Sequence, residues 1–131
     1  MTNGYTIDRT FDNESFDAII ERTRAALADK GFGVLTEIDV RATMKKKIDA
    51  DMSDYTILGA CNPKLAWHAL QSEPRIGAML PCNVIVRKLE DGGVEVSAID
   101  PVASMQAVDN DDLHTVAGEV RGMLEEVVAG I

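Results

Sequence analysis

The stretch from Gly59 to Arg87 constrains the fold more than any other part of this chain. It contains both cysteines, the only tryptophan and three of the four prolines. Two apolar segments typical of buried strands flank a helix that begins at Asn62-Pro63, because Asn caps helix starts and Pro is tolerated in the first turn. If the two strands pair as antiparallel neighbours, the end of the first lies beside the start of the second.

Hydrophobic periodicity predicts the other strands. Alternation of apolar and polar residues indicates strands over residues 5–9, 32–40, 82–87 and 94–99, and a more continuous apolar run indicates a buried strand over 55–61. The strands over 82–87 and 94–99 flank a Gly-rich turn and are expected to form a hairpin. Within the strand over 32–40, one face is expected to carry Phe32, Val34, Thr36 and Ile38.

Apolar residues spaced three and four apart predict two long amphipathic helices. They are expected over residues 14–30 and 111–128, with caps drawn from Asp12 or Asn13 for the first and from Asp109 or Asn110 for the second. A short helix capped by Asp39 is expected over 40–48. No element is predicted over 102–108.

Consecutive strands with the long helices outside them favour the α+β class. We expect a two-layer fold with a mainly antiparallel sheet of about five strands and both long helices on one face. The order is β-α-β-β-β-β-α, with short helical insertions before the third and fourth strands. With 131 residues and no linker or repeat, residues 1–131 are predicted to form a single domain.

The charge balance argues against two classes of partner. The chain has 13 Lys plus Arg against 22 Asp plus Glu, a net charge of -9. This acidity disfavours binding to nucleic acid and to anionic membranes. The N-terminal segment lacks the apolar core of a signal peptide, which predicts a cytoplasmic protein whose two cysteines are free thiols.

Several motifs resemble the family known as domain of unknown function 302. They are LGACNP at 58–63, ALQ at 69–71, LPCNVIV at 80–86, KGFGVLTEID at 30–39 and SAIDP at 97–101. The resemblance extends over most of the chain and implies a TATA-binding-protein-like α/β arrangement, with homodimers in some members. It implies no agreed activity and no established catalytic residues.

Cys61 and Cys82 form the sharpest candidate site. Cys61 lies just before a helix start, where the partial positive charge favours a thiolate, and Cys82 opens the strand expected beside it. The pair could serve as a redox couple, or as ligands for a soft metal or a haem. Alternatively, both are small buried apolar residues, as free cysteines often are.

Three polar residues and the tryptophan complete the candidate region. Asn62 is explained as a helix cap. Asn83 follows Cys82 on the opposite strand face, where it could orient a ligand or make a hydrogen bond at the sheet edge. His68 could join the thiols only if its helix folds back over the strand ends. Trp67 is out of phase with the apolar stripe of that helix, which suggests a partner surface, a pocket rim or packing against the sheet edge.

The sequence leaves three functions open. There is no Ser-His-Asp order, P-loop, GxGxxG or HExxH motif, so no catalytic constellation or cofactor is indicated. The preferred hypothesis is a binding or accessory module that self-associates and holds a small ligand in a pocket near Asn62, Cys82 and Asn83. The alternatives are a thiol-dependent redox or metal-handling protein using Cys61 and Cys82, and a structural homodimer subunit with Trp67 in its interface.

Overall fold

A computed structural model describes residues 3–131. Met1 and Thr2, the first residues of the segment considered as a signal peptide, lie outside these. The elements are β1 (Thr6–Phe11), α1 (Phe16–Asp29), β2 (Gly33–Asp39), α2 (Val40–Ile48), β3 (Tyr55–Cys61), α3 (Pro63–Ser72), the 3-10 helix η1 (Pro74–Met79), β4 (Cys82–Lys88), β5 (Val94–Ile99), α4 (Pro101–Ser104) and α5 (Asp111–Ala129).

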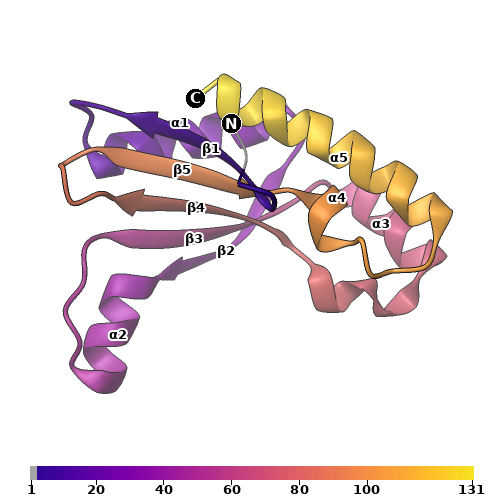
Figure 1. Cartoon of the computed structure of the whole chain (residues 1–131), viewed down its shortest axis with the longest axis horizontal. Coiled ribbons are helices and arrows are strands. Elements are labelled where there is room, and N and C mark those ends of the chain that lie inside the picture. Colours follow the sequence, from indigo (N-terminus) through magenta and orange to yellow (C-terminus); the bar gives the residue numbers. More distant parts are fainter. Residues whose placement is uncertain (1–2) are drawn as a thin grey trace.

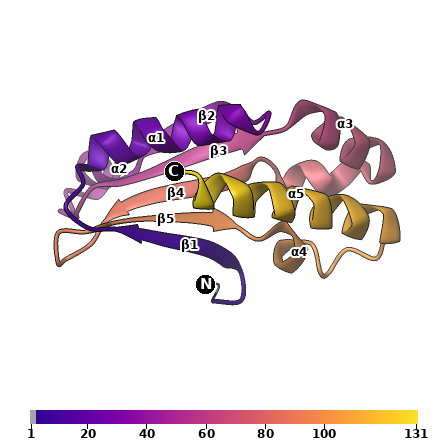
Figure 2. The ribbon, with the colours of Figure 1, turned by 90° about the horizontal axis from the view of Figure 1, so that it is seen from above.

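The five strands form one sheet in the order β1-β5-β4-β3-β2, and every neighbouring pair is antiparallel. Helices α1 and α5 lie side by side over one face of this sheet (Figures 1 and 2). Helices α2 and α3 lie near opposite ends of the strands. The predicted α+β class, with two long helices on one face, is confirmed.

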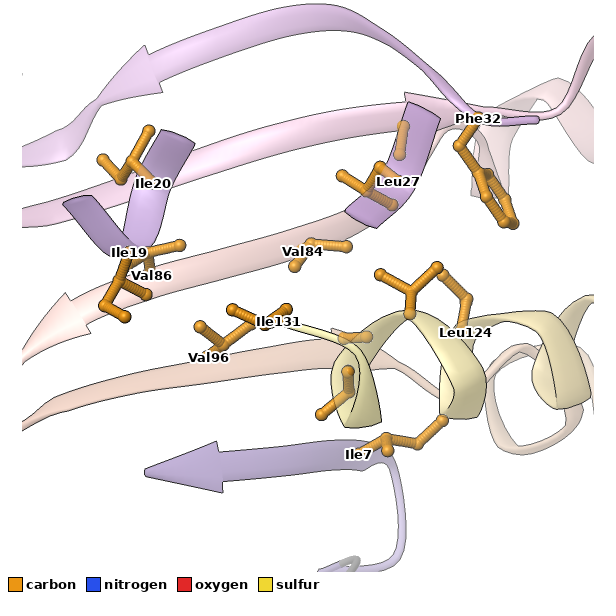
Figure 3. Close-up of a cluster of buried hydrophobic side chains, with 14 of the residues drawn as sticks. Ile7, Ile19, Ile20, Leu27, Phe32, Val84, Val86, Val96, Leu124 and Ile131 are labelled. Carbon is orange, nitrogen blue, oxygen red and sulfur yellow. The ribbon is translucent and has the colours of Figure 1, made fainter. Parts of the chain in front are cut away.

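The main core fills the space between the sheet and the two long helices. Alternate residues of β4 and β5, among them Val84, Val86 and Val96, point toward the helices and are fully buried. Leu27 from α1 and Leu124 from α5 pack onto them (Figure 3). Burying a side chain of this size contributes about 1.5–3 kcal/mol, so this apolar layer holds the helices on the sheet.

The N-cap of α1 differs from the prediction. Ser15, and neither Asp12 nor Asn13, accepts the hydrogen bond from the amide of Ala18. Asn13 has a φ of 60°, whereas an N-cap residue needs extended backbone like that of Ser15. Asn13 therefore turns the chain after β1, and the helix begins at Phe16.

The predicted faces of β2 are wrong beyond Val34 because the strand contains a bulge. Val34 pairs with Ala60, but the next β3 residue, Gly59, pairs with Thr36, so Leu35 is an extra residue. The bulge moves Thr36 and Ile38 to the face that the helices leave uncovered.

Helix α5 is the longest helix, and its start follows the sequence pattern. Asn110 accepts hydrogen bonds from the amides of Asp112 and Leu113, as expected of an N-cap. None of the helices within residues 3–131 has the combination of length and apolar character needed to cross a membrane.

Candidate functional site

A cavity of about 340 Å³ lies at one end of the helix-covered layer, where β3 runs into α3 and η1 runs into β4. Helix α3 and η1 contribute one side of it, and α4 with the first half of α5 contribute another. The side chains that line it include no Asp, Glu, Lys, Arg or His. The lining is therefore uncharged and almost entirely apolar.

Small residues create this space. Where a leucine or valine would fill a core, the lining has its smallest residues, namely Ala60, Ala66, Ala69, Gly77 and Ala117. The larger residues Leu65, Leu70 and Met105 stand around them. Because protein interiors normally leave few voids larger than a water molecule, a space of this volume reflects the choice of residues and not imperfect packing.

Asp100 fixes the α4 part of the wall. Its buried carboxylate accepts hydrogen bonds from the amides of Val102 and Ala103 at the start of α4. It also forms an ion pair with Arg121 of α5, at 3.3 Å from Oδ2 to Nε. The pair holds α4 against α5 and so places Pro101 in the wall of the cavity. No element was predicted over residues 102–108, but the first part of this segment belongs to the short helix α4, which Asp100 caps.

Both thiols line the cavity. Cys82 pairs with Ala60 across β4 and β3, and Cys61 is the next residue along β3. Both cysteines are free. Burial raises the pKa of Cys82 to about 11, and the neighbouring Cys61 contributes to the same shift. Cys82 is therefore a neutral thiol at physiological pH, which makes it a poor nucleophile.

Asn62 lines the same cavity between the end of β3 and the start of α3. Its Oδ1 accepts the hydrogen bond from the Leu65 amide at 3.3 Å, as predicted for an N-cap. Its Nδ2 lies beside Gly31, 3.5 Å from where a Cβ on that glycine would sit. Within residues 3–131 this Nδ2 donates no hydrogen bond to another side chain.

The other two candidate residues lie away from the cavity lining. Asn83 pairs with Gly59 and is exposed on the uncovered face of the sheet. His68 lies on the surface of α3, with Nε2 3.0 Å from Oδ2 of Asp112 on α5. This contact lowers the pKa of the Asp112 carboxyl, with His68 as the largest cause and Ser72 as a smaller one.

Trp67 is 67% exposed, so the interpretation that it packs against the sheet edge is wrong. It lies on α3 outside the cavity-lining stripe.

Residues of α5 and of the segment around α4 supply a part of the wall that was not predicted from the sequence. Its members are Pro101, Met105, Val116, Ala117 and Val120. The available signal was Ala117, a small residue within the apolar stripe of a long helix. Among residues 3–131, no three His, Cys, Asp or Glu side chains are placed to hold a metal ion together.

Comparison with known proteins agrees with the fold. No match was found among curated proteins. The chain is similar to a solved structure titled as an uncharacterized conserved protein DUF302 from Bacillus stearothermophilus, with a TM-score of 0.87, 23% identity and 95% of each chain covered. A family model described as "Domain of unknown function DUF302" matches residues 7–131. The chain therefore belongs to the DUF302 family.

Proposed function

We propose that this protein is a binding module whose cavity between β3, β4, α3 and α5 holds a small apolar molecule. The observation that carries this proposal is the volume of about 340 Å³ combined with an uncharged lining. Small-molecule sites are typically concave, mostly apolar and about 300–1,000 Å³ in volume. The free thiols of Cys61 and Cys82 support a location in the reducing cytoplasm.

A fluorescent apolar probe tests this proposal. N-phenyl-1-naphthylamine is neutral and brightens in apolar surroundings, so we expect titration with the wild-type protein to give a saturable signal. In Ala66→Phe, an aromatic ring occupies the cavity, and affinity should fall by at least about tenfold. Ala28→Phe places the same ring on the exposed face of α1 and should bind like wild type. Equal binding by wild type and Ala66→Phe would contradict the proposal.

A thiol-dependent redox or soft-metal function is the second candidate. Two thiols bordering one cavity favour it, since thiolates are the preferred ligands of soft metals. The raised pKa of Cys82 counts against it, because thiolate is the reactive and ligating form. Alkylation of both cysteines at pH 7 within the time that free cysteine needs would favour this candidate over the binding module.

We also propose that the protein self-associates through the uncovered face of the sheet. Ile38, Ile57 and Ile85 lie directly opposite one another on β2, β3 and β4, and Ile38 is 47% exposed. An apolar stripe across three strands is typical of a surface that a partner covers. Ile57→Glu places a charge at its centre, and we expect sedimentation equilibrium to show a dimer in wild type and a monomer in this variant.

A further inference from the structure

We infer that the ligand is an uncharged, largely apolar molecule carrying one hydrogen-bond acceptor, which Nδ2 of Asn62 binds at the start of α3. This inference rests on the proposed function, because it concerns the chemistry of the molecule held in the same cavity. It specifies the net charge of the ligand, the polar group that the ligand carries and the residue that this group contacts. These follow from the few polar groups in the lining and from the bonds that those groups already make.

The surroundings of the cavity exclude a charged ligand. An ion moved from water into an apolar site loses several kcal/mol of hydration unless it meets a countercharge. Asp100, which precedes α4, and Arg121, which lies on α5, are paired with each other. Neither of these two lines the cavity, so a carboxylate or an ammonium group would find no partner there.

The polar side chains of the lining favour a ligand that carries a hydrogen-bond acceptor. Cys61, Asn62 and Cys82 are the only side chains with a sulfur or amide group among the cavity-lining residues, apart from the thioether of Met105. Asn62 already uses Oδ1 for the Leu65 amide, which leaves the two N–H groups of Nδ2 as donors. The protonated thiol of Cys82 is only a weak donor. A carbonyl, ether or nitrile on the ligand satisfies Nδ2, whereas a second donor gains nothing from it.

The position of Asn62 favours this role. Its side chain is held by the cap hydrogen bond, so its Nδ2 needs little further ordering when a ligand arrives. The positive end of the α3 dipole lies at the same place, which favours an electronegative atom there. The apolar part of the ligand is then accommodated by the small side chains of Ala66 and Ala117.

Three naphthalene probes test charge and polarity separately. Prodan is neutral and has a carbonyl acceptor, N-phenyl-1-naphthylamine is neutral with no strong acceptor, and 1-anilinonaphthalene-8-sulfonate is the same molecule with a sulfonate added. We expect both neutral probes to bind and the sulfonate to bind at least about 100-fold more weakly. Sulfonate binding within tenfold of the neutral analogue would overturn the requirement for an uncharged ligand.

Two variants of Asn62 test the hydrogen bond. Asn62→Ser and Asn62→Asp both keep an oxygen that can cap α3, and both remove the Nδ2 donor. We expect Asn62→Ser to weaken prodan binding by about threefold to tenfold, the value of one net hydrogen bond, and to shift its emission to shorter wavelength. Binding of N-phenyl-1-naphthylamine should stay unchanged. Asn62→Asp, which has nearly the shape of asparagine, should weaken prodan at least as much.

The outcomes separate this inference from the proposed function. If neither neutral probe binds to wild type, the binding module and the inference both fail. If both probes bind and Ala66→Phe removes them, but Asn62→Ser and Asn62→Asp leave the affinity and emission of prodan unchanged, the cavity binds ligands and the role of Asn62 is wrong. A parallel loss of both neutral probes in Asn62→Ser likewise contradicts a hydrogen bond and indicates a disturbed α3.

Discussion

The layer between the sheet and its helices consists of two halves that are packed differently. Over the middle of the sheet, branched side chains such as Val84, Val86 and Leu124 meet in one large buried cluster (Figure 3). Toward α3 and α4, a smaller cluster around Ala69 and Leu113 borders the cavity. Helix α5 runs from the α3 and α4 end back over the sheet (Figure 2). Its residues Val120, Leu124 and Val127 belong to the dense cluster, whereas Leu113 and Ala117 belong to the smaller one.

The difference shows where the chain forgoes stabilising contacts. Filling the hollow half with larger side chains would bury more apolar area, at about 25 cal/mol for each Å². The sequence instead has alanine or glycine at five positions of the lining. Stability is rarely maximised where a site must stay open, so this difference is what the proposed binding function predicts, with the dense half as its scaffold.

The largest expected effect is a difference in the stability lost when a buried leucine of α5 is truncated in one half or in the other. Leu124 and Leu113 are both fully buried, but Leu124 belongs to the dense cluster and Leu113 to the smaller one. We expect Leu124→Ala to lower the free energy of unfolding by about 4 kcal/mol and Leu113→Ala by about 2–3 kcal/mol, since fewer contacts are lost beside an existing space. Urea unfolding measures both, and a larger loss for Leu113→Ala would break the distinction.

Enlarging a buried alanine should lower the stability in the dense half but not in the hollow half. Ala98 lies in the dense cluster on β5, and Ala117 lines the cavity on α5, each almost fully buried. Ala98→Leu should destabilise the fold by about 1–3 kcal/mol because the added methylenes have no room. Ala117→Leu should be neutral or stabilising by up to about 1 kcal/mol, because its side chain fills empty space. Thermal unfolding of the pair is a matched test, and equal losses would show that the cavity is not available to side chains.

Much of the dense half could be predicted from sequence because its signals are local. Alternation in β4 and β5 and the three-and-four spacing in α5 each report one element and its buried face. The cap at Asn62 is equally local. The bulge in β2 was missed because one extra residue leaves the composition of the strand unchanged while reversing its faces beyond Leu35.

The hollow half was harder to predict because a cavity depends on several distant segments together. Its lining combines residues as far apart as Phe32, Cys61 and Val120. The placement of Cys82 and Asn83 on opposite faces did follow from strand geometry, and it keeps Asn83 out of the cavity. The partner of His68 could not be foreseen, because Asp112 lies 44 residues away and meets it only through the packing of α3 on α5.

A smaller effect should appear in the pH dependence of stability at the cavity. The pKa of Cys82 is raised from its ordinary value of 9.0 to about 11, so the folded state keeps the proton that the unfolded state loses. This contribution to stability is fully present below about pH 9 and is lost as the pH rises toward about 11, a change on the order of 1–2 kcal/mol. The stability difference between wild type and Cys82→Ala should shrink over this window in urea unfolding. A difference that stays constant from pH 8 to pH 11 would show that the thiol is not shielded from water.

The smallest effect concerns the surface contacts that fasten α5 at its two ends. Lys30 pairs with Glu126 over the dense half, and His68 pairs with Asp112 over the hollow half, both on the surface. The lowered pKa of Asp112 gives stability that is present above its ordinary value of 3.8 and is lost as the pH falls below it. In His68→Ala we expect carboxyl NMR titration to show the pKa of Asp112 rising toward 3.8, while Thr115→Ala, one turn away on an exposed position, leaves it unchanged.

At neutral pH the loss of this contact should change stability far less than Leu113→Ala does, because exposed ion pairs are screened by water and salt. If His68→Ala proved as destabilising as Leu113→Ala, the hollow half would depend on surface charge to hold α5. The small apolar cluster beneath that helix would then be too weak to keep the cavity open by packing alone. The two halves would then differ in the kind of contact that holds α5, and not only in how densely they are packed.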